Sequence, residues 1–397
     1  MEINDHIKSY IREHSESDVH QLLFAKNKEL TEPELKFAIQ QIEGRQRAKK
    51  KLPTLWANLD VLYPVHLSLE QCSSEETAIY KSSLVKGDSM VDLTGGFGID
   101  TYFLAKKFKQ VTHVERDTDL SQIAAHNFSV LNQTNISCLN TSTEDYLQTT
   151  DKVDLFYIDP ARRDNHGSKI VSIADCTPNL MEIQELFASK SSGALIKLSP
   201  MLDIKQSTRE LDCITDIYVV SVRNECKELL IKTNYTQPNT DNITIHCVNL
   251  LPDNQRENFE FKLNENDNQC ITYTSEIGNY LYEPNASIQK AGGFGSLSRE
   301  LNLNKVHPNS HLFTLNTYLE NFPGRIIKVN EVYGFDKQAL KKLKSELTKV
   351  NLIVRNFPST PQDLLKRLKM NEGGADYLYA TTLNDNRKVL IQGTRCN

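Results

Sequence analysis

A glycine-rich turn constrains this chain more than any other feature. Residues 89–100 read Ser-Met-Val-Asp-Leu-Thr-Gly-Gly-Phe-Gly-Ile-Asp, so an apolar stretch ends at Asp92 and three glycines follow it, Gly95, Gly96 and Gly98. A helical pattern begins after the last glycine. Because glycine has no Cβ, a turn of this kind lets the backbone approach a ligand closely. We therefore expect a strand, a ligand-binding turn and a helix in this order.

The next apolar stretch ends in an acid at the matching place. Residues 111–114 are followed by Glu115, which lies 23 residues after Asp92. In parallel α/β sheets, an acid that ends the second strand accepts the hydroxyl groups of a ribose. Together, the turn and Glu115 predict a nucleotide-type cofactor at the carboxyl edge of the sheet. The alternative is a glycine-rich turn that binds no ligand.

Two details distinguish between cofactors. A dinucleotide fingerprint requires a third glycine, as in Gly-x-Gly-x-x-Gly, and Thr101 occupies that position here. Asp92 would also repel a pyrophosphate, whereas it would attract the ammonium of an amino-acid moiety. S-adenosylmethionine (SAM) carries such a moiety and no phosphate. The sequence therefore predicts SAM as the cofactor and disfavours a NAD(P)-dependent dehydrogenase.

Further apolar stretches extend the expected sheet. Residues 153–158 are almost continuously apolar, as expected for a strand buried on both faces, and they end in Asp159-Pro-Ala-Arg-Arg-Asp. Later strands are expected at 194–198, just before Ser199, and as a hairpin at 216–222 and 226–232. This order predicts an α/β fold with a Rossmann-like class I methyltransferase sheet. We expect a helical N-terminal region and small α+β C-terminal domains around it.

Two motifs resemble those of a known family. The segments Asp-Leu-Thr-Gly-Gly-Phe-Gly at 92–98 and Ile-Asp-Pro-Ala-Arg-Arg at 158–163 resemble the first and fourth motifs of class I SAM-dependent methyltransferases. Their form is similar to that of an RNA-methyltransferase-like family with a ferredoxin-like insert and a THUMP-like C-terminal domain. Residues 354–382 are similar to the final domain of that family. The resemblance implies an RNA-methyltransferase-like protein, but the family does not indicate which substrate is methylated.

The candidate cofactor residues lie in the turn and at the strand ends. We expect them to be Asp92, Thr94, Gly95, Gly96, Gly98, Glu115, Glu144 and Asp159. The adenine contact falls by position near Ser142, where Glu144 or Asp145 could provide it. We expect Asp159 and Arg162 to act in catalysis, and Arg162, Arg163 and Ser199 to contact the substrate. No metal ion is expected.

The turn at Asp159 differs from the one that many N-methyltransferases use. Those enzymes place a second proline and an aromatic ring after the first proline, whereas Ala161 and Arg162 stand at these positions here. Methylation of an adenine or cytosine amine is therefore disfavoured. Asp159 can hold an amine or accept its proton, and Arg162 can clamp a phosphate or stack on a base. Alternatively, Arg162 and Arg163 form a structural ion pair with Asp164.

Composition limits the class of protein. The chain has 397 residues, 39% of them hydrophobic, and a formal net charge of −5, which suits two or three globular domains and excludes a wholly basic coat protein. The sequence contains no apolar run of about 18 residues, the length needed to span a membrane, and the first residues lack a secretory pattern.

The eight cysteines show no Cys-x-x-Cys spacing, so they indicate reduced thiols and a cytoplasmic location. Cys176 could act as a nucleophile in pyrimidine C5 methylation, but a packing role is favoured.

Basic residues are concentrated at the C-terminus. Residues 325–397 contain 14 Lys and Arg against 7 Asp and Glu, although the whole chain is acidic. This asymmetry predicts phosphate contacts with RNA, and the alternative is a solvated lysine-rich surface. A second basic run, residues 45–51, is either a solvated helix end or an edge that follows phosphates.

The sequence thus predicts four regions. They are a helical N-terminal region at 1–63, a SAM-dependent methyltransferase domain at 64–235, a β-rich connector with a small ferredoxin-like unit at 236–322, and a THUMP-like basic domain at 323–397. The predicted function is SAM-dependent methylation of an rRNA or tRNA base. The alternative is a catalytically silent RNA-binding protein with the same fold.

Overall fold

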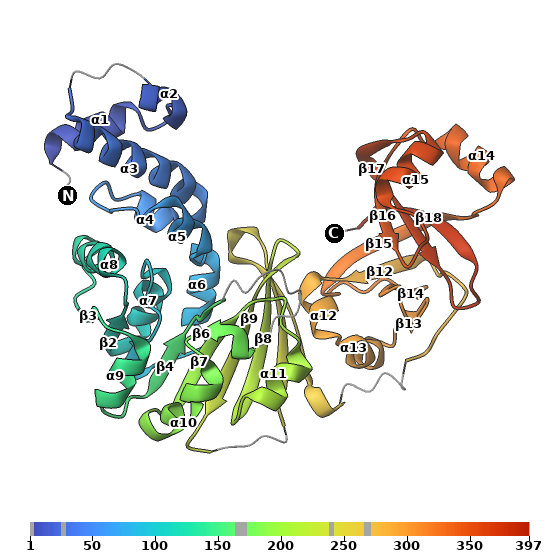
Figure 1. Ribbon diagram of the computed structural model, residues 1–397. Coiled ribbons are helices and arrows are strands. Elements are labelled where there is room, and N and C mark those ends of the chain that lie inside the picture. Colours follow the sequence, from blue (N-terminus) through green and yellow to red (C-terminus); the bar gives the residue numbers. More distant parts are fainter. Residues whose placement is uncertain (1–3, 25–28, 163–172, 238–241, 266–270, 397) are drawn as a thin grey trace. The chain divides into compact units, whose positions relative to one another are not determined.

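A computed structural model describes residues 4–24, 29–162, 173–237, 242–265 and 271–396, apart from the side chains of His66, Leu67 and Arg162 (Figure 1). The chain forms two compact units, Met1–Thr215 with Leu230–Thr240, and Asp216–Leu229 with Asp241–Asn397. Within the described ranges, every helix is too short or too polar to cross a bilayer.

Helices form the N-terminal region, as predicted. In the described part of the chain, those before the first strand are α1 (Asp5–Glu13), α2 (Val19–Phe24), α3 (Glu32–Lys51), α4 (Pro53–Trp56), α5 (His66–Gln71) and α6 (Glu75–Ser82). A capping box between Thr31 and Glu34 starts α3, and Pro53 follows its end. The apolar faces of α1, α2 and the first half of α3 pack on one another through a core that includes Ile7, Ile39 and Ile42.

A second core joins these helices to the first part of the sheet. Leu52, Leu55 and Tyr63 from the helical region are buried together with Phe103 and Phe128. The helical region therefore shares its core with α7 (Ile99–Leu104) and α8 (Thr118–Val130), the helices of the first part of the sheet.

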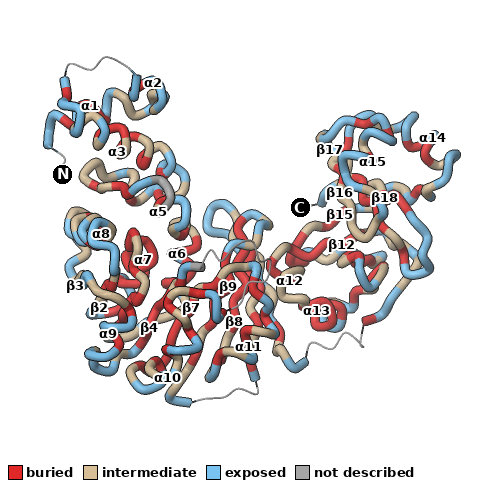
Figure 2. The backbone as a smooth tube through the Cα atoms, viewed as in Figure 1, coloured by how far each residue is buried: buried red, intermediate tan, exposed pale blue. Residues whose placement is uncertain are grey.

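The central sheet has the predicted class I methyltransferase arrangement. Its strand order is β11-β10-β8-β9-β7-β4-β1-β2-β3. The parallel strands are β1 (Gly87–Asp92), β2 (Phe108–Val114), β3 (Ile136–Leu139), β4 (Leu155–Ile158) and β7 (Gly193–Leu198). The helices between and after them are α7 (Ile99–Leu104), α8 (Thr118–Val130), α9 (Thr143–Thr149), α10 (Leu180–Lys190) and α11 (Ile204–Glu210). Burial is greatest in the middle of this sheet, where every residue of β4 is buried (Figure 2).

The expected hairpin follows, and two more strands extend the sheet. Arg223 and Asn224, both with positive φ, form the turn between β8 (Ile214–Val222) and β9 (Glu225–Asn234). β10 (Thr244–Leu250) runs parallel to β8, and β11 (Arg256–Lys262) runs antiparallel to β10. A small ribbon pairs β5 (Ala161–Arg162) with β6 (Cys176–Thr177). Short 3₁₀ turns lie at Ala105–Lys107, Ile173–Asp175, Pro252–Asn254 and Leu263–Glu265.

The C-terminal part is built on one further sheet. Its seven strands have the order β13-β14-β12-β15-β18-β17-β16. They are β12 (Tyr280–Pro284), β13 (Asn304–Lys305), β14 (Phe313–Leu315), β15 (Gly324–Gly334), β16 (Lys349–Arg355), β17 (Asn371–Thr382) and β18 (Lys388–Arg395). The helices are α12 (Ala286–Ala291), α13 (Phe294–Leu301), α14 (Lys337–Glu346) and α15 (Pro361–Leu368). The predicted small α+β C-terminal part is therefore present.

Gly96 and Gly98 in the turn after β1 serve different purposes. Both have positive φ, 53° and 82°. A Cβ on Gly98 would lie 2.6 Å from Cζ of Phe128, whereas a Cβ on Gly96 would meet no described atom closer than the Thr94 carbonyl oxygen at 3.9 Å. Gly98 is therefore needed for packing, while Gly96 faces open space.

This difference predicts unequal stabilities. Gly96→Ala should lower the free energy of unfolding by about 1 kcal/mol, because alanine is strained at positive φ. Gly98→Ala should lower it by roughly 1–3 kcal/mol more, because the added methyl group collides with Phe128. Thermal unfolding of the two ligand-free variants measures both losses. Equal losses would show that Phe128 moves aside without cost.

Candidate functional site

The turn after β1 is bonded to three neighbouring elements. The Leu93 N–H donates to the Tyr157 carbonyl of β4 at 2.9 Å, and the Gly95 N–H donates to the Val114 carbonyl of β2 at 2.8 Å. The Thr143 hydroxyl of α9 donates to the Leu93 carbonyl at 2.5 Å. These bonds hold the carboxyl ends of β1, β2 and β4 close together, at the edge where open α/β sheets bind ligands.

Asp92 is buried at the end of β1. Its carboxylate accepts hydrogen bonds from the Thr94 N–H at 3.0 Å and from the Thr101 hydroxyl at 2.6 Å. The Thr101 hydroxyl also lies 2.9 Å from Nδ1 of His113. Because Thr101 gives its one proton to Asp92, Nδ1 of the neutral His113 ring is the donor in this second bond.

Charge around Asp92 is unfavourable for a carboxylate. Burial raises the pKa of Asp92 to about 7, against the effect of the bonds from Thr101 and Thr94. The neighbouring carboxylates of Asp100 and Asp159 raise it further. A cation bound nearby would favour the ionised form of Asp92, and an anion would oppose it.

Glu115 is oriented toward the glycine turn. One carboxylate oxygen accepts the Gly96 N–H at 2.7 Å, and the other accepts the Asp117 N–H at 2.7 Å. Gly96 itself is partly exposed. The residues present therefore fit a group with hydroxyls, such as a ribose, because the Glu115 carboxylate keeps further lone pairs that can accept from them.

Asp159 joins the same edge from β4. Its N–H donates to the Thr94 hydroxyl at 2.7 Å, and its carboxylate forms an ion pair with Lys197 of β7. Burial raises the pKa of Asp159, and the ammonium of Lys197 opposes that rise. The carboxylate is thus held in a fixed direction and remains 35% exposed.

A second buried ionic group lies beside these residues. Asp100 accepts bonds from the Ser73 hydroxyl and the Tyr157 hydroxyl, both at 2.7 Å. The Lys81 ammonium of α6 is completely buried and lies 3.0 Å from the Asp100 carboxylate. Burial alone would raise the pKa of Asp100, but Lys81 and Lys197 outweigh it and lower the pKa. Ser73, Lys81, Asp100 and Tyr157 form what we call the Asp100 cluster.

The remaining predicted site residues lie in different surroundings. Glu144 is exposed in the first turn of α9, and Asp145 accepts a bond from the Ser142 hydroxyl at 2.7 Å. Ser199 follows β7, and its hydroxyl oxygen accepts the Met201 N–H at 3.2 Å. The Arg162 side chain and Arg163 lie outside the described residues, so their predicted roles stay predictions.

Sequence reasoning missed Lys81, Asp100, Tyr157 and Lys197. One signal was present for Lys197, because a lysine inside the otherwise apolar run 194–198 needs a partner when it is buried. Lys81 gives no such signal, because its position at the end of a short capped helix also suits an exposed residue.

Comparison with known proteins assigns the C-terminal part. A family model described as a ferredoxin-like domain matches residues 280–323, and one described as THUMP domain-like matches residues 324–395. A search of curated proteins gives no match.

One solved structure resembles the whole chain. A Porphyromonas gingivalis W83 protein, described as a "putative methyltransferase", is 32% identical, and the match covers 100% of both chains with a TM-score of 0.90. An rRNA methylase from Streptococcus thermophilus is 15% identical, and the match covers 40% of this chain and 92% of that one with a TM-score of 0.30. The second match is too weak to support an argument. The first shows that the chain belongs to the family of class I methyltransferases that carry a ferredoxin-like and a THUMP-like C-terminal domain.

Proposed function

We propose that the protein is a SAM-dependent methyltransferase that acts on RNA. The observation that carries the proposal is the convergence of Gly96, Glu115 and Asp159 at the carboxyl ends of β1, β2 and β4. Gly96 faces open space, Glu115 can accept hydroxyls beside it, and Asp159 presents a partly exposed carboxylate. When bound, SAM supplies an electrophilic methyl group.

Electrostatics favours SAM over a dinucleotide. Asp92, Asp100 and Asp159 are close enough to influence one another, and the ammonium groups of Lys81 and Lys197 act on Asp100 and Asp159. A positively charged ligand would relieve the repulsion among these carboxylates, whereas a pyrophosphate would add to it. SAM carries an ammonium and a sulfonium. Thr94, Gly96 and Glu115 would hold its nucleoside, and the carboxylates would lie toward its cationic part.

Asp159 is the candidate for the chemical role. A methyl acceptor with an N–H or O–H must lose a proton, and a positioned carboxylate can accept it. Lys197 holds the Asp159 carboxylate in place and favours its ionised form. Methyl transfer needs an in-line approach and little else, so positioning supplies most of the rate enhancement.

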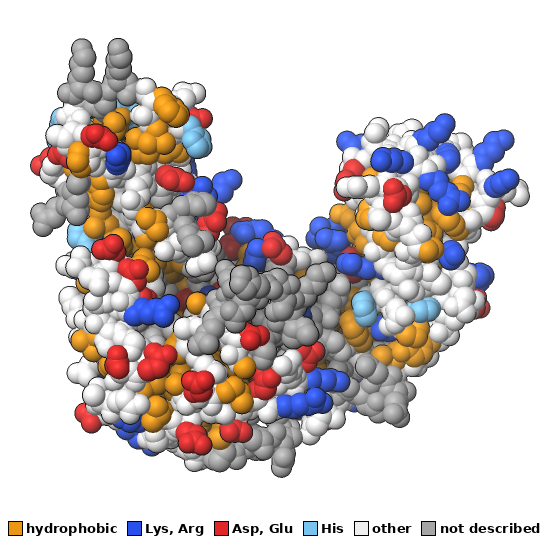
Figure 3. All heavy atoms as spheres, viewed as in Figure 1, with side chains coloured by type: hydrophobic (Ala, Val, Ile, Leu, Met, Phe, Trp, Pro, Cys, Tyr) orange, Lys and Arg blue, Asp and Glu red, His pale blue; other side chains and the backbone are white. Residues whose placement is uncertain are grey.

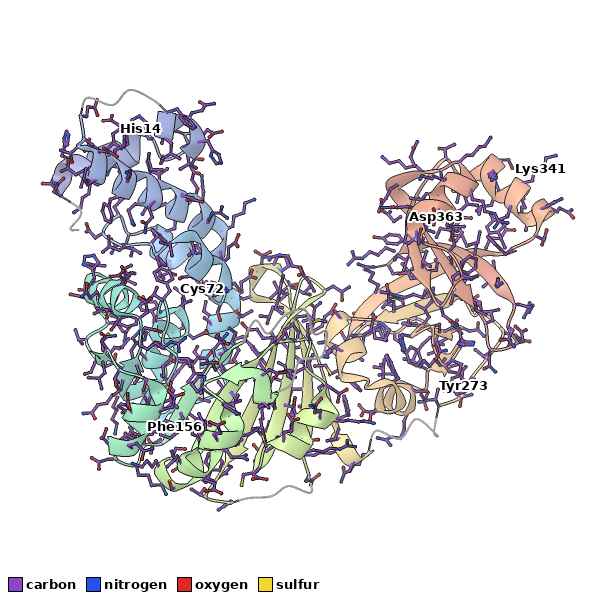
Figure 4. The ribbon with its side chains drawn as sticks, viewed as in Figure 1. His14, Cys72, Phe156, Tyr273, Lys341 and Asp363 are labelled. Atoms are coloured by element: carbon purple, nitrogen blue, oxygen red, sulfur yellow. The ribbon has the colours of Figure 1, made fainter. Side chains whose placement is uncertain are left out.

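The THUMP-like part supports RNA as the substrate. The lysines of α14 form a basic surface, which includes Lys341 (Figures 3 and 4). Lys337, Lys341 and Lys344 are exposed, and only Lys342 of this helix pairs with an acid among the described residues. Lys366, Arg367 and Lys369, in and after α15, are exposed as well. Lysines without partners can exchange counterions for phosphates.

Glu115→Gln should weaken SAM binding about tenfold or more, because the ribose loses charge-assisted hydrogen bonds. Asp119→Asn, an equal charge change at an exposed position of α8, should leave the dissociation constant unchanged. Calorimetry gives the dissociation constants of SAM and of NAD for both variants and for the native protein. Tighter binding of NAD than of SAM by the native protein would overturn the cofactor assignment.

Asp159→Asn should keep most of the SAM affinity, because Glu115 still holds the ribose, and should lower methyl transfer at saturating SAM by about a hundredfold or more, the usual contribution of a positioned acid or base. Asp151→Asn, at an exposed position just before β4, is the matched control. The measurement is the transfer of a labelled methyl group from SAM to RNA from cells that lack the gene. If the native protein binds SAM and RNA but methylates none of this RNA, the catalytically silent alternative is correct.

Replacing Lys337, Lys341 and Lys344 together by Gln should weaken RNA binding. Each lost phosphate contact should reduce the slope of log K against log salt by about 0.7 for single strands. Lys86, Lys109 and Lys152 are exposed at the opposite, amino edge of the parallel strands, and their triple Gln variant is the control. Filter binding at several salt concentrations compares the two. Equal slopes for both variants would exclude α14 as an RNA contact.

A further inference from the structure

The N-terminal helices form an open pocket that the methyltransferase site does not use. The pocket has a volume of about 150 Å³ and lies between α1, α3 and the segment that begins at Trp56. Its charged and aromatic lining residues are Arg12, Glu16, Arg45, Lys49 and Trp56. His14, labelled in Figure 4, is the residue after α1 and marks this part of the chain. We refer to this open pocket as the Trp56 pocket.

Arg45 gives the pocket a buried positive charge. Its side chain is only 8% exposed, and its guanidinium donates to the carbonyl oxygens of Trp56 at 2.7 Å and Asn58 at 3.1 Å. Within the described ranges, no acidic side chain pairs with Arg45. Buried charges are normally paired, because the loss of hydration is costly. A buried guanidinium that borders a pocket and bonds only to carbonyl groups is therefore suited to an anion.

Two further cations line the pocket. Arg12 is exposed in the last turn of α1, and no acid among the described residues pairs with it. Lys49 pairs with Glu16 at 2.6 Å, but these side chains are 48% and 75% exposed. Exposed pairs of this kind contribute little, so an incoming anion can replace Glu16. With three cations and one carboxylate, the lining carries an excess of positive charge.

Trp56 adds an aromatic surface beside these charges. The guanidinium carbon of Arg45 lies 5.8 Å, and Nζ of Lys49 lies 5.7 Å, from the centre of its ring. The side chain is partly exposed. Proteins that bind single-stranded RNA combine cations for the phosphates with aromatic rings for the bases.

Arg47 and Lys51, two other basic residues of the run at 45–51, form contacts outside the pocket. Arg47 pairs with Glu43 and Glu70, and Lys51 donates to the carbonyl oxygens of Leu69 and Glu70. Lys50 is exposed but does not line the pocket. Of the basic residues in this run, Arg45 and Lys49 therefore line the pocket.

We propose that the Trp56 pocket binds a nucleotide phosphate of single-stranded RNA, with the attached base beside Trp56. A volume of about 150 Å³ has room for several water-sized groups and therefore for a phosphate. Because Trp56 is partly exposed, the base would lie at the mouth of the pocket. The identity of the ligand as RNA rests on the proposed function, whereas the anion site itself does not. A free nucleotide has the same chemistry, and the test separates the two sources.

The pocket has its own spectroscopic probe, because Trp56 is the single tryptophan of the chain. The full-length protein is titrated with a short oligoadenylate, with AMP and with inorganic phosphate while tryptophan fluorescence is recorded. We expect a saturable change, with the oligoadenylate binding most tightly. Equally tight binding of AMP or phosphate would identify a free nucleotide or phosphate as the ligand and keep the site. If none of the three ligands causes a saturable change, the proposed site in the Trp56 pocket is wrong.

Neighbouring lysines of α3 provide a matched pair of variants. Lys49→Gln and Arg12→Gln should each weaken oligoadenylate binding about tenfold and lower its salt dependence. Lys50→Gln, the same change one residue away from Lys49, should alter neither. Equal weakening by Lys49→Gln and Lys50→Gln would reveal general charge attraction and exclude the pocket.

Calorimetry with SAM on the same variants separates this proposal from the proposed function. We expect unchanged SAM affinity in all three, because none of the altered residues belongs to the strand ends of the sheet. If the native protein fails to bind SAM or to methylate RNA while the fluorescence pattern holds, the pocket stands and the enzymatic proposal fails. If SAM binding and methylation hold while the three titrations give no signal, the pocket alone is excluded.

Discussion

The turn after β1 is the constraint on which the rest of the site depends. Successive groups of this turn bond to different elements: Leu93 to β4 and α9, Thr94 to the N–H of Asp159, and Gly95 and Gly96 to the end of β2. β1 lies between β4 and β2 in the sheet, so one turn can reach both neighbours. The turn therefore contacts both Glu115 and Asp159, and the two roles proposed for them require one ligand to meet both.

Charge at this edge is balanced by residues from outside the turn. Burying a carboxylate is costly unless a cation or hydrogen bonds compensate it. Lys81 is completely buried against Asp100, and Lys197 lies against Asp159. Burial raises the pKa of Asp92 to about 7, because among the described residues only the hydrogen bonds from Thr101 and Thr94, and no lysine, oppose that rise. This remaining imbalance gives a physical reason for a cationic cofactor at the site.

The two C-terminal family segments depend on each other structurally. Their boundary falls between residues 323 and 324, directly before β15. β15 pairs with β12 from the ferredoxin-like segment and with β18 from the THUMP-like segment, so both segments share one sheet. Their buried residues also form a common core, to which both Leu281 and Ile391 belong. The THUMP-like segment is therefore altered more safely by surface substitutions than by truncation.

The sequence alone determined the class I methyltransferase sheet, because strand periodicity, the glycine turn and the acids at the strand ends are local patterns. Glu115 and Asp159 could be placed at one edge since parallel strands end at the same side of a sheet. The tertiary structure alone decided the partners of these acids. Lys81 meets Asp100, and Arg45 borders the Trp56 pocket, only because helices distant in sequence pack there. Burial and pairing arise from such packing, so no local pattern could predict them.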